Sequence, residues 1–554
     1  MENSHLEGEA HSFDAAASQE LRSLIAAAVE THGPLPLPQS TGVTDAAAPM
    51  TSAHGTLTFA EFAEIVDAIN DITATATDAR IIRAWNATLT KLLATALTQV
   101  SQQSGYRRAL SDTLQARSGR TIPWKDAMPA ATGVAFLYNF SPFQDTGATV
   151  ASKRIRNFER SFDVISCSFL HRKKQDYTVE SIAEPYITSK YFLPLAPSWA
   201  SWEPFKAFAV RASAFAEKKL RNGAQYDMMY SRAMWAPSMF AAKLFKSRHP
   251  EIRWVAEFSD PMSLDVEGLP RGGEVPDDAL SRAFIEDIVA EYPELRDQDF
   301  SIFSLAETLV YAFADDIMFT NSNQMKEMLD HISSDRLRDR VKSKAIVSNH
   351  PTLPRQYYLR EDSGYVVDDA KLNLGYFGEF YSSRSITEVT SAMRTLPEEL
   401  RKRVHLHVFT NFIPSGPGNQ RPRNMSKRQY DDYVRRAYDG VGAEGIEDQV
   451  TFNASLPFLK FLATTEKLDY LIVNDAKTGS HHSVNPFLPS KWSDYAGSSA
   501  KSWGFVEPSS ILSSKPVTVK TPVGDALAAR TALWKMVEEK FGPYQEGVNH
   551  ADPA

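Results

Sequence analysis

Hydrophobic positions recur at helical spacing through the first part of the chain. The segments Gln19–Thr31, Thr58–Ile72 and Asp78–Gln103 each repeat apolar residues three and four positions apart, as amphipathic helices do. A proline-rich stretch near residues 33–50 interrupts this pattern. The pattern therefore predicts a helical N-terminal extension over residues 1–130, and we find no catalytic motif in it.

From Gly133 onward, short apolar runs alternate with helical stretches. The runs do not alternate cleanly between apolar and polar residues, which is typical of parallel strands covered on both faces. We expect a first Rossmann-like α/β domain over residues 131–365, with strands at 133–139, 162–169, 226–231, 253–259, 316–321 and 345–348 and helices at 202–220, 237–247 and 279–292.

The pattern then restarts after a polar stretch, residues 354–370, which we interpret as a linker. A second Rossmann-like α/β domain is predicted over residues 366–525, with a closing helix and tail over 526–554. Its expected strands are 372–380, 404–409, 450–452, 471–473, 502–506 and 517–519, with a helix at 385–395. Two such domains joined by one linker predict a ligand cleft between two sets of strand carboxyl ends.

Composition narrows the class of protein. A chain of 554 residues is too long for one core, and 43% hydrophobic residues indicate a globular protein. The net charge of -8 gives no support for nucleic-acid binding. The single cysteine, Cys167, lies in an apolar run and is expected to be a buried structural thiol. No signal-peptide pattern and no apolar run of about 20 residues is present, so we expect a cytoplasmic protein.

One stretch, Asn485–Ser498, follows a predicted buried strand and a polar loop. We expect Ser490 at the N-cap of a short helix, with Lys491 beside it to bind phosphate and Asp494 one turn later to bind ribose hydroxyls. The alternative is an ordinary helix start in which Lys491 and Asp494 form a surface ion pair.

A second loop of the same domain carries Gly378 and Arg384. The glycine lets the backbone approach a ligand closely, and the guanidinium of Arg384 is suited to a bidentate bond with a diphosphate. The alternative is a plain strand-to-helix turn with a solvated arginine.

Three residues of the first domain are candidates for binding an acceptor molecule. Gly147 follows the first predicted strand, and Arg232 and Asp260 follow two others. A carboxylate such as Asp260 at a strand tip can orient or deprotonate a hydroxyl group. For Gly147 the alternative is a tight turn, and for Asp260 a turn starter before Pro261.

No metal site or cofactor is expected. His481 and His482 lack a third ligand at a metal-binding spacing, and we interpret them as solvated histidines. Basic clusters in the first domain, such as His171–Lys174, are compatible with contact to an anionic membrane surface.

These segments resemble bacterial glycosyltransferases of the GT-B fold, of the family-four type. The resemblance covers about residues 131–525 and rests on Trp254–Pro261, Asp316–Ser322, Leu374–Gly378 with Arg384, and Pro489–Tyr495. The last is similar to a Pro-Ser-Lys-x-x-Glu-Tyr variant of the family's donor-site helix.

The resemblance implies a nucleotide-diphosphate sugar as co-substrate, transfer with retention, and no tightly held metal. Arg384 and Lys491 would bind the donor diphosphate and Asp494 the ribose, and the loop at Gly147 would meet donor or acceptor. We assign catalytic roles to Asp260, Arg384 and Lys491, donor binding to Gly378, Arg384, Ser490, Lys491 and Asp494, and acceptor binding to Gly147, Arg232 and Asp260.

Two positions depart from the family pattern. Pro486 stands where the pattern has the first glutamate of Glu-x7-Glu, which usually touches the sugar, and Val389 stands near a common lysine. The expected reaction is sugar transfer to a cell-envelope glycan or lipid-linked acceptor, with residues 1–130 available for homo-oligomer contacts. The alternatives are an epimerase or phosphorylase on this fold, or a non-catalytic glycan- or partner-binding protein, which the missing glutamate favours slightly.

Overall fold

The computed structural model describes residues 11–36, 56–101, 103–116, 122–233, 235–380, 384–414, 421–479 and 481–544. The chain divides into two compact units. One comprises residues 1–199 and 203–255, and the other comprises residues 200–202 and 256–554. The domain boundaries predicted near residues 130, 365 and 525 stay predictions.

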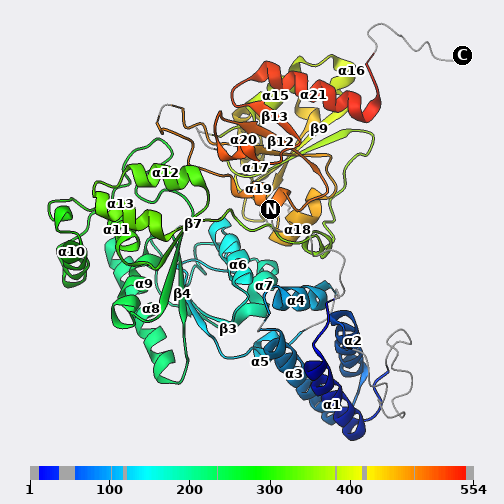
Figure 1. Cartoon of the computed structure of the whole chain (residues 1–554). Coiled ribbons are helices and arrows are strands. Elements are labelled where there is room, and N and C mark those ends of the chain that lie inside the picture. Colours follow the sequence, from blue (N-terminus) through cyan, green and yellow to red (C-terminus); the bar gives the residue numbers. More distant parts are fainter. Residues whose placement is uncertain are drawn as a thin grey trace, which may run out of the picture. The chain divides into compact units, whose positions relative to one another are not determined.

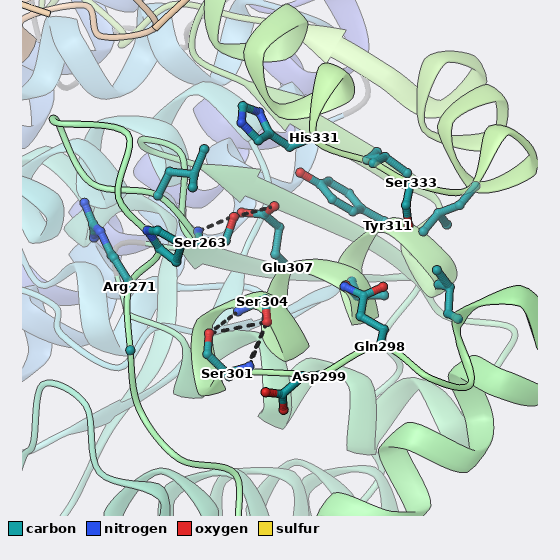
Figure 2. Close-up of a pocket in the computed structure, with 17 residues that line it drawn as sticks. Ser263, Arg271, Gln298, Asp299, Ser301, Ser304, Glu307, Tyr311, His331 and Ser333 are labelled. Carbon is teal, nitrogen blue, oxygen red and sulfur yellow. Dashed lines mark hydrogen bonds between the residues drawn. The ribbon is translucent and has the colours of Figure 1, made fainter. Parts of the chain in front are cut away.

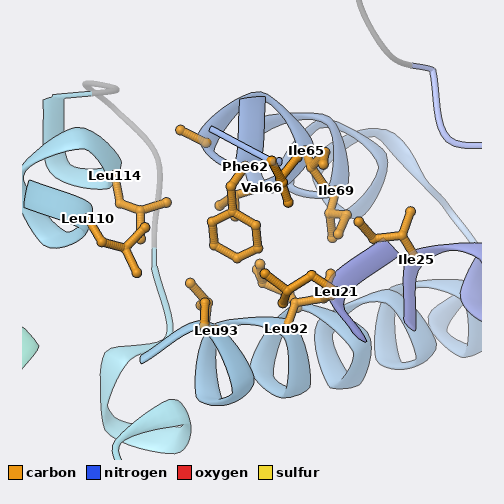
Figure 3. Close-up of a cluster of buried hydrophobic side chains, with 14 of the residues drawn as sticks. Leu21, Ile25, Phe62, Ile65, Val66, Ile69, Leu92, Leu93, Leu110 and Leu114 are labelled. Carbon is orange, nitrogen blue, oxygen red and sulfur yellow. The ribbon is translucent and has the colours of Figure 1, made fainter. Parts of the chain in front are cut away.

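The N-terminal residues form helices around a hydrophobic core of their own (Figures 1 and 3). Asp14 and Thr58 cap the first two helices, and Thr58 forms a reciprocal capping box with Glu61. Most of the proline-rich stretch near 33–50 lies outside the described residues. The helices are α1 (Ala15–His32), α2 (Phe59–Thr75), α3 (Ala79–Val100), α4 (Tyr106–Ala116) and α5 (Trp124–Ala127).

Helix α4 connects this helical part to the first sheet through a buried arginine. Arg107 donates hydrogen bonds to the Ser161 hydroxyl and the Pro185 carbonyl, both at 3.0 Å. Its guanidinium also lies 5.2 Å from the centre of the Tyr186 ring. Burial lowers the pKa of Arg107 to about 10, so the side chain stays charged at neutral pH.

The first sheet has seven strands in the order β3-β2-β1-β4-β5-β6-β7. The strands are β1 (Gly133–Phe136), β2 (Phe162–Cys167), β3 (Ile187–Leu193), β4 (Met228–Ala233), β5 (Arg253–Phe258), β6 (Asp316–Phe319) and β7 (Ala345–Val347). The helices between them are α6 (Thr146–Phe158), α7 (Glu180–Ala183), α8 (Trp202–Arg221), α9 (Pro237–Arg248), α10 (Ala279–Glu291), α11 (Ile302–Phe313), α12 (Ser322–Asp330) and α13 (Asp335–Lys344).

Strand β3 is the element of this sheet that the sequence pattern misses. Its middle residues, Thr188, Ser189 and Lys190, are polar and half-buried because β3 is an edge strand beside β2. The strand predicted at 133–139 ends at Phe136. Cys167 is buried as expected, and burial raises the pKa of its thiol to about 12.

The second sheet has six strands in the order β10-β9-β8-β11-β12-β13, and its neighbouring strands pair in parallel. The strands are β8 (Leu372–Phe377), β9 (Val404–Thr410), β10 (Val450–Ala454), β11 (Tyr470–Asn474), β12 (Lys501–Val506) and β13 (Val519–Pro522). The helices are α15 (Thr387–Thr395), α16 (Glu398–Arg401), α17 (Lys427–Gly440), α18 (Phe458–Thr465), α19 (Ser490–Tyr495), α20 (Ile511–Ser514) and α21 (Ala526–Phe541).

One expectation for this region needs correction. The last strand runs over 519–522 instead of 517–519. The stretch interpreted as a linker contains a helical turn, α14 (Gln356–Leu359), whose Tyr357 and Tyr358 are buried. The apolar residues of the closing helix α21 pack into the core of the second sheet.

The predicted fold class, α/β with two Rossmann-like sheets and an N-terminal helical part, is confirmed (Figure 1). Across the described ranges, we find no helix that combines the length and the apolar character needed to cross a bilayer.

Candidate functional site

The second sheet has a topological switch point between β8 and β11. The chain winds outward from β8 through β9 to β10, and then resumes on the other side of β8 with β11, β12 and β13. In a parallel sheet of this order, ligands bind outside the carboxyl ends of the two central strands. Gly378 follows β8 directly, and Asn474 and Asp475 lie at the end of β11.

Asp475 is a buried carboxyl group at this switch point. One of its oxygens, Oδ2, accepts a hydrogen bond from the Glu507 amide at 2.9 Å. The other, Oδ1, is buried and has no hydrogen-bond partner among the described residues. Burial raises the pKa of Asp475 to about 6, while the Ser510 hydroxyl, the Glu507 amide and the positive charge of Arg384 act in the opposite direction. Such a carboxyl group can accept a hydrogen bond from a ligand hydroxyl or exchange a proton with it.

Two further polar atoms at the same place are incompletely satisfied. The Asn474 amide nitrogen donates to the Ser385 carbonyl, but its Oδ1 is buried and has no partner within the described part of the chain. The Nε atom of Arg384, a half-buried residue, is also buried and has no hydrogen-bond partner among the described residues. Buried polar atoms are rarely left without partners. A cation, an amide and a carboxyl group with such atoms at one switch point therefore indicate a polar ligand site.

Glu507 holds the loop after β11 in place. Its carboxylate accepts hydrogen bonds from the amide and hydroxyl of Thr478, both at 2.7 Å, and from the Asn485 side chain at 2.9 Å. The Gly479 amide also donates to it, at 3.2 Å. Since Glu507 also presents its own amide to Asp475, it joins the loop to the candidate site.

The sequence prediction named Gly378 and Arg384 for this site but missed Asn474, Asp475 and Glu507. For Asn474 and Asp475, the available signal was the sudden change from apolar to polar residues at the end of β11. The Gly378 amide donates to the Phe409 carbonyl at 3.0 Å, which extends the ladder between β8 and β9.

Helix α19 carries the other predicted donor-site residues. It begins at Ser490 with Pro489 at the N-cap, so the prediction of Ser490 as N-cap is wrong. Lys491 Nζ lies 3.6 Å from an Asp494 carboxylate oxygen and 4.1 Å from the centre of the Phe461 ring. The ion pair that we considered as the alternative is therefore present. The donor-binding roles of Ser490, Lys491 and Asp494 stay predictions.

The loop that holds Pro486 is fixed by asparagines of the β6–α12 segment. Asn321 Nδ2 donates to the Pro486 carbonyl at 2.9 Å, and Asn323 Nδ2 donates to the Asn485 carbonyl at 3.1 Å. The position where the family pattern has glutamate thus contributes a backbone contact.

His482 lies in the same loop, and its prediction as a solvated residue is wrong. Its side chain is fully buried, with Nδ1 2.9 Å from a Glu327 carboxylate oxygen. Its Nε2 lies 3.2 Å from the carbonyl oxygens of both Asp265 and Val266. Both ring nitrogens therefore face oxygen atoms. Among the described residues, no group of three metal-ligating side chains is present.

The first sheet has its own switch point, between β1 and β4. Asn139 follows β1 and is buried, and neither side-chain atom of its amide has a hydrogen-bond partner in the described ranges. The Ser141 hydroxyl and the Trp235 indole nitrogen are also buried and lack partners among those residues. A hydroxyl group, an amide and the indole of Trp235 together are suited to a hydroxylated ligand.

The three acceptor candidates lie on loops or strands of this first sheet. Arg232 is buried near the end of β4, and Asp260 lies two residues after β5. The Gly147 amide donates to Oδ1 of Asp145, the N-cap of α6, at 2.7 Å. Asp145 in turn pairs with Lys173. In this conformation the Gly147 amide is therefore occupied, and the acceptor-binding roles of all three residues stay predictions.

Comparison with known proteins finds distant structural similarity and no match in sequence. No protein-family model matches the chain, and no curated protein matches it. A sucrose-phosphate synthase from Thermosynechococcus elongatus is 12% identical, with a TM-score of 0.44 over 74% of this chain and 90% of that chain. A UDP-forming α,α-trehalose-phosphate synthase from Burkholderia xenovorans, in complex with glucose-6-phosphate, is 10% identical, with a TM-score of 0.44 over 73% and 92%.

A UDP-GlcNAc 2-epimerase from Neisseria meningitidis, bound to UDP-GlcNAc, is 8% identical, with a TM-score of 0.37 over 74% of this chain and 95% of that chain. At such identities and TM-scores, similarity says nothing about the substrate or the chemistry of this chain.

Proposed function

We propose that this protein is a glycosyltransferase that binds a nucleotide-diphosphate sugar at the β8–β11 switch point. The observation that carries the proposal is the set of buried, incompletely satisfied polar atoms of Arg384, Asn474 and Asp475 at the carboxyl ends of a Rossmann-like sheet. The guanidinium supplies charge for a diphosphate, and the amide and carboxyl groups supply acceptors for hydroxyl groups.

In the proposed reaction, the diphosphate is the leaving group. Arg384 stabilises the negative charge that develops on it, and Lys491 adds a second cation after release from Asp494. Asp475 binds a hydroxyl of the donor sugar through its Oδ1 atom. It would thereby replace the sugar-binding glutamate of the family pattern, whose position is occupied here by Pro486. Asp494 remains our proposal for the ribose. We propose retention of configuration and independence from metal ions.

The acceptor is proposed to bind at the first sheet, where Asn139 and Trp235 join the predicted Gly147, Arg232 and Asp260. We propose a hydroxylated acceptor of the glycan or lipid-linked glycan type. The acceptor hydroxyl needs orientation and loss of a proton during transfer, and Asp260 is the proposed group for this step.

Release of nucleoside diphosphate from a panel of nucleotide sugars tests the proposal. We expect turnover in the native protein with at least one donor, and loss of turnover by a factor of about 100 or more in Arg384→Ala, as for other removed transition-state donors. Arg394→Ala is the matched control, because Arg394 is an exposed arginine on the following helix, α15.

Two results would contradict the proposal. One is unchanged turnover in the double variant Arg384→Ala/Lys491→Ala. The other is conversion of a nucleotide sugar into its epimer without release of nucleoside diphosphate, which would identify an epimerase.

A further inference from the structure

A cavity of about 400 Å³ lies between α11, the loop after β5 and the segment between α12 and α13. This volume falls within the range of small-molecule sites in proteins. Figure 2 shows Glu307 and Ser263 near its centre, with Tyr311 and His331 on one side and Gln298 on the other. None of these residues belongs to the proposed nucleotide-sugar site.

Glu307 forms a fixed acceptor in this cavity. One carboxylate oxygen, Oε2, accepts hydrogen bonds from the amides of Met262 and Ser263 at 3.1 and 3.0 Å. The other, Oε1, accepts one from the Ser263 hydroxyl at 3.0 Å, and a carboxylate oxygen can accept two. Burial raises the pKa of Glu307, and the Ser263 amide, the Tyr311 hydroxyl, the Ser263 hydroxyl and the Met262 amide oppose the shift. A ligand hydroxyl that reaches this carboxylate therefore takes its place beside the Tyr311 hydroxyl, which faces the same group.

Tyr311 supplies a buried hydroxyl without an assigned role. Its side chain is 3% exposed, and its Oη faces the Glu307 carboxylate without forming a well-aligned hydrogen bond within the described residues. Burial and then the charge of Glu307 raise the pKa of Tyr311 well above its usual value, so the hydroxyl remains a donor. A buried hydroxyl that lines a cavity and lacks a well-aligned partner points to a polar ligand.

His331 adds a directional group on the same side. Its Nδ1 lies 2.8 Å from the Glu327 carbonyl oxygen, so Nδ1 carries the proton and Nε2 is the acceptor in the neutral ring. Its side chain is 48% exposed, which leaves it at the mouth of the cavity. The titratable groups of the lining are Arg271, Asp299, Glu307, Tyr311 and His331. With one cation against two carboxyl groups, the lining does not favour an anion.

We propose that this cavity binds a neutral, polyhydroxylated ligand of monosaccharide size. The hydroxyl of Tyr311 donates to a ring or hydroxyl oxygen of the ligand, and Oε1 of Glu307 accepts from an adjacent hydroxyl. Gln298 and the serines of the lining complete the polar contacts. Because this site lies outside the switch point, it is a second carbohydrate site and does not depend on the proposed transfer reaction.

Titration calorimetry of the full chain without nucleotide tests this site. The probes are D-glucose, D-mannose and N-acetyl-D-glucosamine, each compared with its 6-phosphate. We expect at least one neutral sugar to bind, and to bind more tightly than its phosphate. Tyr311→Phe should weaken that binding roughly three- to tenfold, the usual effect of one lost hydrogen bond.

Tyr292→Phe is the matched control, because Tyr292 is another buried tyrosine and does not line the cavity. Absence of binding by all three neutral sugars, binding of the phosphates alone, or equal weakening by both tyrosine variants would each overturn the proposal. Sugar binding with no nucleotide-sugar turnover would contradict the transferase proposal alone, so the two failures are distinguishable.

Discussion

At the scale of single residues, Asp475 combines a cost in stability with a proposed role in binding. Its carboxyl group is buried and half-satisfied, and its pKa lies at about 6. When the pKa of an acid is higher in the folded than in the unfolded protein, its contribution to stability is greatest at low pH, where the acid is protonated in both states. That contribution is lost as the pH rises from the unfolded value near 4 to the folded value near 6. Functional sites often keep such groups at the expense of stability.

Asp475→Asn should therefore stabilise the protein at pH 7.5. The side chain keeps an oxygen for the Glu507 amide and loses the buried charge, so we expect a gain of about 1–3 kcal/mol from a shift of about two pKa units. The gain should shrink toward pH 4. Urea denaturation at a series of pH values measures it. A destabilised variant at pH 7.5 would show that the carboxylate is satisfied in the native state.

His482 provides a second residue-scale prediction. Removing it leaves the buried Glu327 carboxylate with the Ser483 hydroxyl but without its imidazole partner, so His482→Ala should destabilise the protein by about 3 kcal/mol. The neighbouring His481 is exposed, and His481→Ala should change stability by less than about 0.5 kcal/mol. Similar effects in chemical denaturation of the two variants would contradict the buried pair.

At the scale of elements, the position of α19 depends on close contact with α14. The Tyr358 hydroxyl donates to the Asp494 carbonyl at the end of α19. A Cβ atom at Gly497 would lie 2.4 Å from that hydroxyl oxygen, closer than real contacts allow. Only a glycine therefore lets α19, which carries Lys491 and Asp494, pack against this tyrosine.

Gly497→Ala should destabilise the protein by about 1–3 kcal/mol, the usual cost of overpacking. Gly440→Ala is a suitable control, because Gly440 is helical and a Cβ atom there meets nothing within 4 Å. We expect that control to be neutral or stabilising by up to about 1 kcal/mol. Thermal denaturation compares the two variants. Equal stability of both would show that Tyr358 moves aside without cost.

Individual strands and loops show which parts of the fold and of the site could be predicted from the sequence. Mostly apolar runs such as those of β2 and β8 can be recognised in the sequence, because burial on both faces restricts the choice of residue. Strand β3 does not, since an edge strand tolerates the polar residues 188–190. At the site, Arg384 was predictable from its place after a strand and a glycine. Glu507 was not, because its role comes from a loop that precedes it by more than 20 residues.

At the scale of the whole molecule, the N-terminal helices have a core separate from the two sheets. Phe62, Leu92 and Leu93 lie at its centre and are fully buried (Figure 3). Phe62→Ala should destabilise this helical part by about 3–5 kcal/mol through the cavity it leaves. Nucleotide-sugar binding should remain unchanged, because the proposed donor site lies on the second sheet.

Hydrogen exchange and calorimetric titration of the Phe62→Ala variant measure the two effects separately. Faster exchange in α1–α4 with unchanged binding is the expected result. Loss of donor binding in this variant would show that the helical part supports the donor site.

Binding of nucleoside diphosphates tests the central claim most directly. Calorimetric titration of the native protein, Arg384→Ala and the control Arg394→Ala separates donor binding from any acceptor requirement. We expect at least one nucleoside diphosphate to bind the native protein and the control equally, and Arg384→Ala to bind about tenfold or more weakly, as for a lost charge-assisted contact. Equal affinity in Arg384→Ala, or no binding by any of the diphosphates, would contradict a nucleotide-sugar site at the β8–β11 switch point.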